Sequence, residues 1–160
     1  MPQSFREEEK QWLGQARNCF ACGMENPASM GIHLYRVADR VYADYAVPAR
    51  FRGLSKTTHG GIVCTLLDEV TVSGISYLLN ETCVTAEMTV RFKKPVPIET
   101  PLRLCCWIVG REGRVVRGRG EIIGPDDQVL AEAETKAIAL DKEKAKRFLA
   151  PDAIAKMEKP

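Results

Sequence analysis

Histidine is scarce in this sequence, with only His33 and His59 among 160 residues. A cysteine nucleophile needs an adjacent base, most often a histidine, before it becomes reactive. Cys64 lies in an apolar segment and has only these two histidines to activate it, so we expect it to pack rather than to react. His33 falls within a predicted strand, where we expect a packed or edge histidine.

The sequence also lacks the apolar segments that direct a chain to a membrane or out of the cell. Residues 1–12 contain acidic groups and no apolar core, unlike a secretory signal. No uncharged apolar run is long enough to span a bilayer. The net charge is only +2, which is too small to predict a nucleic-acid partner. We therefore expect a cytoplasmic protein with neither membrane nor nucleic-acid partners.

Six cysteines are present, but their arrangement does not fit a disulfide framework. Cys105 and Cys106 are adjacent, and secreted scaffolds are shorter and denser in cysteine. Cys19-x-x-Cys22 could be half of a zinc site with His33 as a third ligand, but no second such pair supplies the rest. A redox role would require a βαβ context. We interpret this pair as part of a turn and expect reduced thiols and no metal.

Hydrophobic periodicity and turn signals divide the chain into three regions without repeats or linkers. These are an N-terminal region, 1–17, with a surface helix from about Ser4, its N-cap, to Arg17, a main domain at 18–140 and a polar tail at 141–160 that is helical to Phe148. The main domain has predicted strands at 32–37 and 41–47, a helix at 59–79, and strands at 82–92, 102–109, 114–123 and 128–140. This is an α+β arrangement, in which an antiparallel sheet, its last four strands in meander order, curls around one helix.

The helix predicted at residues 59–79 carries only two fully charged side chains, Asp68 and Glu69. A surface helix would show a polar stripe opposite its apolar one. A helical wheel places the large apolar residues around Val70 and puts Asp68 on the opposite side, near Ile75 and several small residues. We expect this helix to be covered on both sides, by its own sheet and by a second subunit.

A carboxylate in such a helix is a candidate functional group. Burial disfavours its ionised form by several kcal/mol and raises its pKa unless hydrogen bonds or a cation offset the cost. The alternative is a structural acid that caps a loop or pairs with an arginine of the partner subunit. Asp68 and Glu69 point about 100° apart, so the sequence does not decide which of them is the working acid.

His59-Gly60-Gly61 stands at the start of this helix. The first N–H groups of a helix have no intrahelical partner and point out of its N-terminus. Glycine allows a ligand to approach the backbone, and the helix dipole favours an oxygen that acquires negative charge. These are the requirements of an oxyanion hole in acyl transfer.

The segment H-G-G-x-x-x-x-L-x-D resembles the helix motif of hotdog-fold thioesterases of the phenylacetate-pathway type, within the 4-hydroxybenzoyl-CoA thioesterase superfamily. The later segment from Thr85 to Pro95 is similar to the strand that follows it. The resemblance extends over about residues 18–140. It implies an acyl-CoA thioesterase with no cofactor or metal. It also implies a homodimer or a dimer of dimers with active sites at the subunit interface.

The resemblance also implies roles for individual residues. Asp68 would be general base or nucleophile, and the Gly60 N–H would bind the thioester oxygen. His59 would contact that oxygen or shape the loop, and Thr85 would orient the attacking water. One departure is upstream, where Arg52-Gly53-Leu54-Ser55 stands in place of a polar Asn or Gln.

Four further residues are predicted to contact the substrate: Gly61, Glu69, Lys93 and Lys94. The lysines could bind the phosphates of CoA, and the alternative is a solvated strand edge protected by charge. Two other functions stay open, a non-catalytic acyl-CoA-binding protein and a CoA-thioester hydratase. A hydratase would need a histidine base, and His59 is committed to the glycine turn. The sequence does not specify the acyl group.

Overall fold

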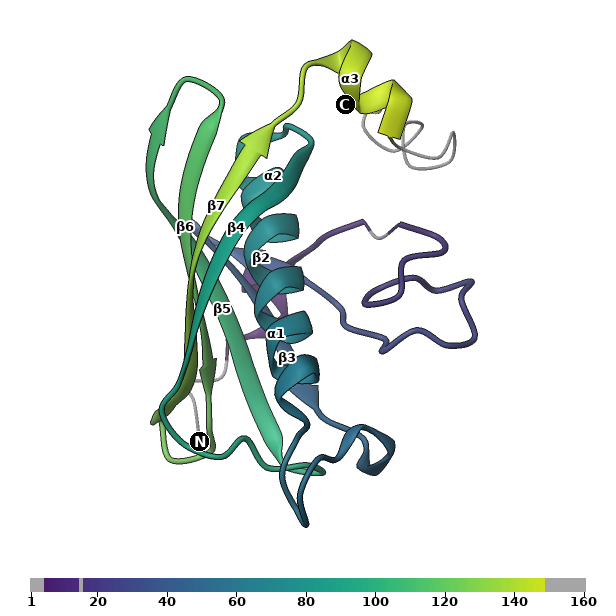
Figure 1. The fold of residues 1–160 in the computed structure, drawn as a ribbon, viewed down its shortest axis with the longest axis vertical. Helices are drawn as coiled ribbons and strands as arrows, with labels where there is room; N and C mark the ends of the chain where they lie inside the picture. Colours follow the sequence, from purple (N-terminus) through teal and green to yellow (C-terminus); the bar gives the residue numbers. More distant parts are fainter. Residues whose placement is uncertain (1–4, 15, 149–160) are drawn as a thin grey trace.

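The computed structural model describes residues 5–14 and 16–148, which form a curved antiparallel sheet around one long helix (Figure 1). The strands are β1 (Gln11–Trp12), β2 (Tyr35–Val37), β3 (Arg40–Ala46), β4 (Cys83–Phe92), β5 (Pro101–Glu112), β6 (Val115–Ile123) and β7 (Val129–Ala139). The described chain also contains a short 3-10 turn, η2 (Ala49–Phe51), and the predicted helical tail, α3 (Lys142–Phe148). The predicted α+β architecture, a hotdog fold, is confirmed.

The position of β4 corrects the predicted strand order. The sheet runs β1-β2-β3-β5-β6-β7-β4, so β5, β6 and β7 form the expected meander while β4 pairs with β7. The connection from β4 to β5, residues 93–100, contains two prolines and is too long for a tight hairpin. It carries the chain across the end of the sheet. As a result β4 is an edge strand of ten residues.

The central helix consists of α1 (Gly60–Asp68), the π-helical segment η3 (Glu69–Ser73) and α2 (Gly74–Leu79). The wider π turn rotates every later residue relative to an ideal α-helical wheel. Ile75 was predicted on the Asp68 side, and this prediction is wrong. Ile75 is fully buried with residues of the sheet because the π segment turns it inward.

Glycines in β6 allow this helix to approach the sheet closely. A Cβ at Gly120 would lie 2.4 Å from Thr71 Oγ1, and one at Gly118 would lie 2.7 Å from Ile75 Cδ1. Thr71 is fully buried, and its hydroxyl donates to the Leu67 carbonyl at 2.5 Å. The π segment therefore rests on a strip of backbone that tolerates no added side-chain volume.

By length and composition, Gly60–Leu79 is a helix that could cross a membrane. Half of it is buried within the protein, and Val63, Leu66 and Leu67 belong to the main core. The core helix of a globular domain has the same properties, and the packing against the sheet accounts for this one.

The N-terminal residues correct another prediction. The surface helix expected at residues 4–17 is not found in its described part, which forms the 3-10 turn η1 (Glu7–Glu9) followed by β1. The Trp12 ring packs edge-on against Tyr35, with centroids 5.3 Å apart. Pairing with β2 thus overrides a weak local helix preference. The predicted N-cap, Ser4, lies outside the described residues.

Residues 16–34 cross the face of the helix that is turned away from the sheet (Figure 1). Ala21 and Met30 are buried in the same core cluster as Leu66 and Val70. From the sequence we expected turns at residues 18–31 and a second subunit over this face of the helix. Part of that cover comes instead from the same chain.

Candidate active site

Asp68, the last residue of α1, faces the edge strand β4. The Thr85 hydroxyl donates to Asp68 Oδ1 at 2.7 Å. Both residues were predicted as catalytic, and the fold brings them together although they lie 17 positions apart. Asp68 is half-buried in the single chain, so one subunit alone does not give it the full burial that the sequence predicted.

His59 caps the N-terminus of the helix, where its Nδ1 accepts a hydrogen bond from the Gly61 N–H at 3.0 Å. Its role in shaping the glycine turn is therefore visible. Gly61 was predicted to contact substrate, but its N–H is already engaged by this cap. The Gly60 N–H is exposed and makes no hydrogen bond to the described part of the chain. Gly60 is the better placed of the two glycines to bind an anionic oxygen.

Gly60 and Asp68 lie at opposite ends of α1, and eight residues of α-helix rise about 12 Å. Strand β4 runs beside α1 in the opposite direction. Its Thr85 contacts Asp68, and a Cβ at Gly60 would lie 3.8 Å from the Phe92 ring. Within one chain, the acid and the amide donor are therefore too far apart to act on one carbonyl group.

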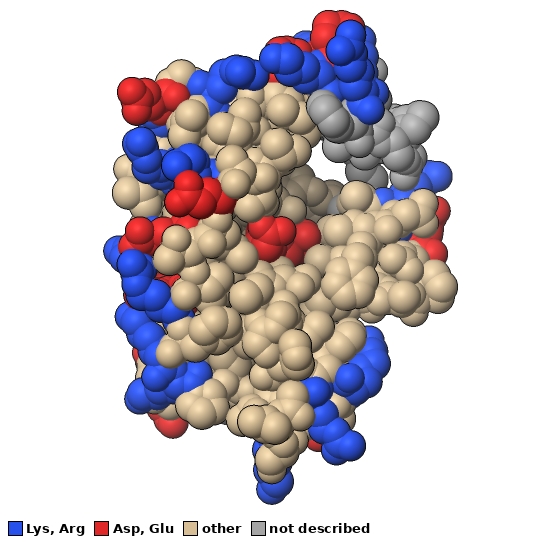
Figure 2. Space-filling view, viewed as in Figure 1, with Lys and Arg blue, Asp and Glu red and all other residues tan. Residues whose placement is uncertain are grey.

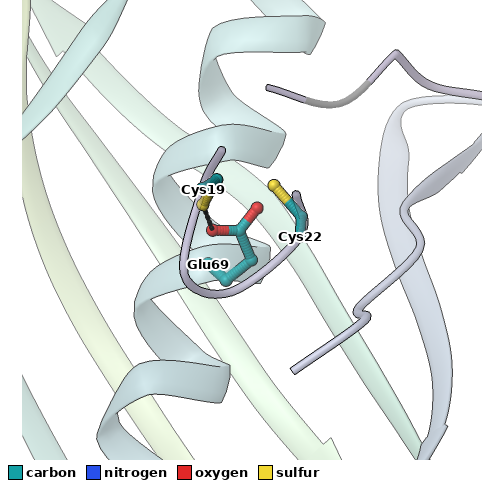
Figure 3. A group of neighbouring side chains, drawn as sticks. All are labelled: Cys19, Cys22 and Glu69. Atoms are coloured by element: carbon teal, nitrogen blue, oxygen red, sulfur yellow. Dashed lines mark hydrogen bonds between the residues drawn. The ribbon is translucent and has the colours of Figure 1, made fainter. Parts of the chain in front are cut away.

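Glu69 is buried beside two cysteines, and its predicted contact with substrate stays a prediction. Its side chain is 8% exposed and points toward Cys19 and Cys22 in the segment that crosses the helix (Figure 3). Cys19 Sγ lies 3.9 Å from Glu69 Oε2, and Glu69 Oε1 has no hydrogen-bond partner among the residues that the structure describes. Burial raises the pKa of Glu69 to about 7.

The two thiols beside Glu69 differ from each other. A hydrogen bond from the Cys22 thiol lowers the pKa of Cys19 to about 5, with further help from the backbone N–H groups of Cys22 and Ala21. The same thiol bond and burial raise the pKa of Cys22. His33, the third metal ligand considered from sequence, is exposed and is not part of this group. Nothing in local spacing links Glu69 to cysteines that precede it by about fifty positions.

Lys93 and Lys94 follow directly after β4 and are exposed. Lys93 Nζ forms an ion pair with Glu132 at 2.6 Å, and Lys94 Nζ donates to Gln128. Their predicted contact with CoA phosphates stays a prediction. Figure 2 shows lysine and arginine around the margins of this view, along the sheet side, across the top and at the lower right, while its centre is largely uncharged around one acidic patch.

A separate groove of about 450 Å³ lies on the outer face of the sheet, across β4, β6 and β7. Its lining includes charged residues of both signs, among them Arg117, Arg119 and Glu134. It contains none of the predicted catalytic residues, and the helix lies on the other face. The chemistry therefore points to the Asp68 side of the helix rather than to this groove.

Comparison with known proteins gives a match to a family model and to solved structures of the same fold. Residues 55–131 match the family model of the thioesterase superfamily. The solved thioesterase superfamily protein RHA08564 has the same fold, with a TM-score of 0.71 and 25% identity over 76% of this chain and 60% of that one. The PaaI protein of E. coli, from the phenylacetic acid degradation operon, aligns with a TM-score of 0.61 and 17% identity over 70% of this chain and 81% of its own.

A sequence relative makes the comparison more specific. Acyl-coenzyme A thioesterase THEM4 of Xenopus laevis is 35% identical over 83 residues, which cover 52% of this chain and 36% of that protein. The chain thus matches little more than a third of the relative's length. The match over residues 55–131 agrees with the thioesterase superfamily predicted from the motifs.

Proposed function

We propose that this protein is an acyl-CoA thioesterase that hydrolyses a thioester to a carboxylic acid and free CoA. The observation that carries the proposal is the hydrogen bond from Thr85 to Asp68, which fixes an acid beside an exposed sheet edge. The thioesterase-superfamily match and the similarity to an acyl-CoA thioesterase support the same reaction.

In the proposed reaction Asp68 acts as a general base. It accepts a proton from a water molecule as that water attacks the thioester carbonyl, and Thr85 keeps the carboxylate in position. The carbonyl oxygen becomes negative and is stabilised by the Gly60 N–H at the helix N-terminus. The C–S bond then breaks, and the thiolate of CoA takes up the proton.

We further propose that each active site combines two chains, because about 12 Å separates Gly60 from Asp68 in one chain. β4 has a free edge, and Thr85 and Phe92 lie toward its two ends. If two copies pair antiparallel along β4, the Thr85 end of one strand meets the Phe92 end of the other. Asp68 then lies near Gly60 of the partner subunit, and the two active sites are related by a two-fold axis.

The exposure of β4 supports this assembly. Val84 is 40% and Phe92 56% exposed in the single chain, and a long edge strand with exposed apolar residues favours pairing. The interface would also complete the burial of Asp68, which one chain leaves half-exposed. A dimer of dimers would add a second interface without changing the site.

The proposed substrate class is acyl-CoA, with its phosphates near Lys93 and Lys94 at the end of β4. Each lysine would exchange its present partner, Glu132 or Gln128, for a phosphate oxygen. The acyl group would lie between subunits against apolar residues, and its identity stays open.

The test is a thiol-release assay of the full chain with short, long and aromatic acyl-CoAs, comparing the wild type with Asp68→Asn. The proposal predicts hydrolysis that Asp68→Asn lowers at least about 100-fold. Tight binding without turnover, or addition of water to an enoyl-CoA, would replace it with a binding protein or a hydratase. A single turnover in H₂¹⁸O distinguishes the two hydrolytic routes. The general-base route labels only the released acid, whereas label in the Asp68 carboxylate would show a mixed anhydride that water opened at the Asp68 carbonyl.

A further inference from the structure

Residues 19–23 form a tight turn that brings two thiols together. The Gly23 N–H donates to the Cys19 carbonyl at 2.9 Å, and the Ala21 N–H donates to Cys19 Sγ at 3.3 Å. A Cβ at Gly23 would lie 2.5 Å from Cys19 N, so the turn excludes any larger residue there. Backbone N–H groups that point at a sulfur favour its thiolate form, which is the form that binds metals.

Backbone bonds tie the turn to the later part of the same segment, residues 16–34. The N–H groups of Met30 and Ile32 donate to the carbonyls of Phe20 and Ala21 at 2.9 and 3.0 Å. Cys22 is 6% exposed, so the thiols lie at the base of the segment rather than in solvent. The two sulfur positions are therefore largely fixed before any ligand binds.

Glu69 supplies a third ligand atom from the first turn of the π segment (Figure 3). Among the ion pairs of the described residues, none includes Glu69. Within residues 5–14 and 16–148, one of its buried oxygens has no hydrogen-bond partner, although a buried carboxylate oxygen normally has one. An unpaired acid that points at two thiols is arranged for a cation.

The spacing fits a zinc ion. Tetrahedral zinc, with bonds of about 2.3 Å to sulfur and about 2.1 Å to oxygen, separates its ligand atoms by about 3.6–3.8 Å. Cys19 Sγ and Glu69 Oε2 are 3.9 Å apart, and all the ligand atoms of the three residues lie within 4.8 Å of one another. Side-chain shifts of about 1 Å complete the geometry, well within rotamer adjustment.

We propose that Cys19, Cys22 and Glu69 form a zinc site that pins residues 16–34 to the central helix. Two thiolates with one carboxylate suit zinc, and three protein ligands leave the fourth position for water. Both thiols lose their protons to solvent when the ion binds. The sequence analysis expected no metal because it lacked a further ligand, and Glu69 provides one through the fold.

The proposed ion stabilises the fold and takes no part in hydrolysis. Its ligands are distinct from the Asp68–Thr85 pair, which makes its own hydrogen bond on the β4 side. Its effect is to hold residues 16–34 against the central helix, because the metal links residues about fifty positions apart. Loss of the ion should therefore lower the thermal stability of the whole chain.

The test is metal binding by the full chain, purified under reducing conditions and stripped with a chelator. Zinc is measured by elemental analysis and by competition with a chromophoric chelator. Cobalt serves as a spectroscopic substitute, since thiolate ligands give it a charge-transfer band. We expect one zinc per chain, a tetrahedral thiolate spectrum for cobalt, and a melting temperature that rises on zinc addition.

Variants separate the three-ligand site from adventitious binding. Loss of an outer-shell partner alone costs about 10–100-fold in metal affinity, so Cys19→Ser, Cys22→Ser and Glu69→Gln should each cost at least about 100-fold. Cys64→Ser removes a thiol outside the group and should bind zinc like the wild type. Asp68→Asn should also bind normally, which keeps this test independent of the proposed hydrolysis. Circular dichroism verifies the fold of each variant.

Three results would overturn the site. The first is zinc content no higher than that of a buffer blank. The second is affinity unchanged in Glu69→Gln, which would leave the cysteine pair alone responsible. The third is a Cys19–Cys22 disulfide formed under the reducing conditions used, with no metal bound.

Discussion

Asp68 and Glu69 are neighbours in sequence, yet they occupy two different environments. Asp68 faces β4, is half-exposed and accepts a hydrogen bond from Thr85. Glu69 faces the segment of residues 16–34, is 8% exposed and lies beside two thiols. A step of about 100° around the helix thus separates a proposed catalytic acid from a proposed metal ligand.

The difference arises from what covers each face. In the proposed dimer the Asp68 face lies against another copy of the chain along β4, whereas residues 16–34 of the same chain cover the Glu69 face. The degree of burial alone would select Glu69 as the functional acid, since its pKa is raised to about 7. Its partners instead suggest a structural role, so the chemistry of the surrounding groups decides the assignment.

Replacement of each acid by its amide should give the largest difference in kcat between the two positions. Asp68→Asn should lower kcat at least about 100-fold, because the proposed base is lost while the shape is kept. Glu69→Gln should leave kcat within a few-fold in zinc-free protein while metal binding is lost. Thiol-release kinetics of both variants provide the measurement. An equal loss of kcat in the two would assign catalysis to both acids.

The Gly60 N–H can be removed without disturbing the helix. Proline is favoured at the first helical position, where its missing N–H takes no intrahelical bond. Gly60→Pro should lower kcat by about 10²–10³-fold, the usual loss for one oxyanion donor. Gly60→Ala keeps the N–H, and its Cβ would meet only Phe92 at an ordinary 3.8 Å. Equal activity of the two variants would exclude the N–H from the mechanism.

Thr85 should act by positioning Asp68. A hydrogen bond to a charged group contributes about 1.5–3 kcal/mol, so Thr85→Ala should lower kcat by roughly 10–100-fold. Thr85→Ser keeps the hydroxyl and should recover most of the rate. Thr89→Ala, also exposed on β4, is the matched control. A rate loss in Thr89→Ala as large as in Thr85→Ala would point to strand distortion instead.

The smallest effect on hydrolysis is expected from substitutions where the central helix packs against the sheet, because these change the stability of the fold. A Cβ at Gly120 would meet Thr71 Oγ1 at 2.4 Å, and one at Gly110 would meet nothing within 4 Å. Gly120→Ala should destabilise the fold by about 1–3 kcal/mol through overpacking. Gly110→Ala should stay within about 0.5 kcal/mol of the wild type. Denaturant unfolding tests both, and equal stabilities would contradict the close packing.

Much of the fold could be predicted because hydrophobic periodicity is local. The helix and the strands from residue 82 onward were located within a few positions. The order of β4 could not be predicted, since pairing with β7 depends on contacts far along the chain. The orientation of Ile75 was missed because a wheel with a fixed period has no π turn.

The candidate site was predictable to a similar degree. Asp68, Gly60 and Thr85 were predicted from their motifs, and the fold joins Asp68 to Thr85. The environment of Glu69 was not predictable, because its partners come from a segment about fifty positions earlier that carries no periodic signal. The partners of Glu69 are set by contacts in the folded chain, and residue type alone does not reveal such contacts.

The composite site is tested most directly by mixing two inactive variants, Asp68→Asn and Gly60→Pro. In a mixed dimer one site carries both defects and the other carries neither. If subunits exchange at random, about a quarter of the wild-type activity should return, because half of the dimers are mixed and each has one intact site of two. A mixture that stays inactive, with exchange verified by differently tagged chains, would contradict an active site shared between subunits.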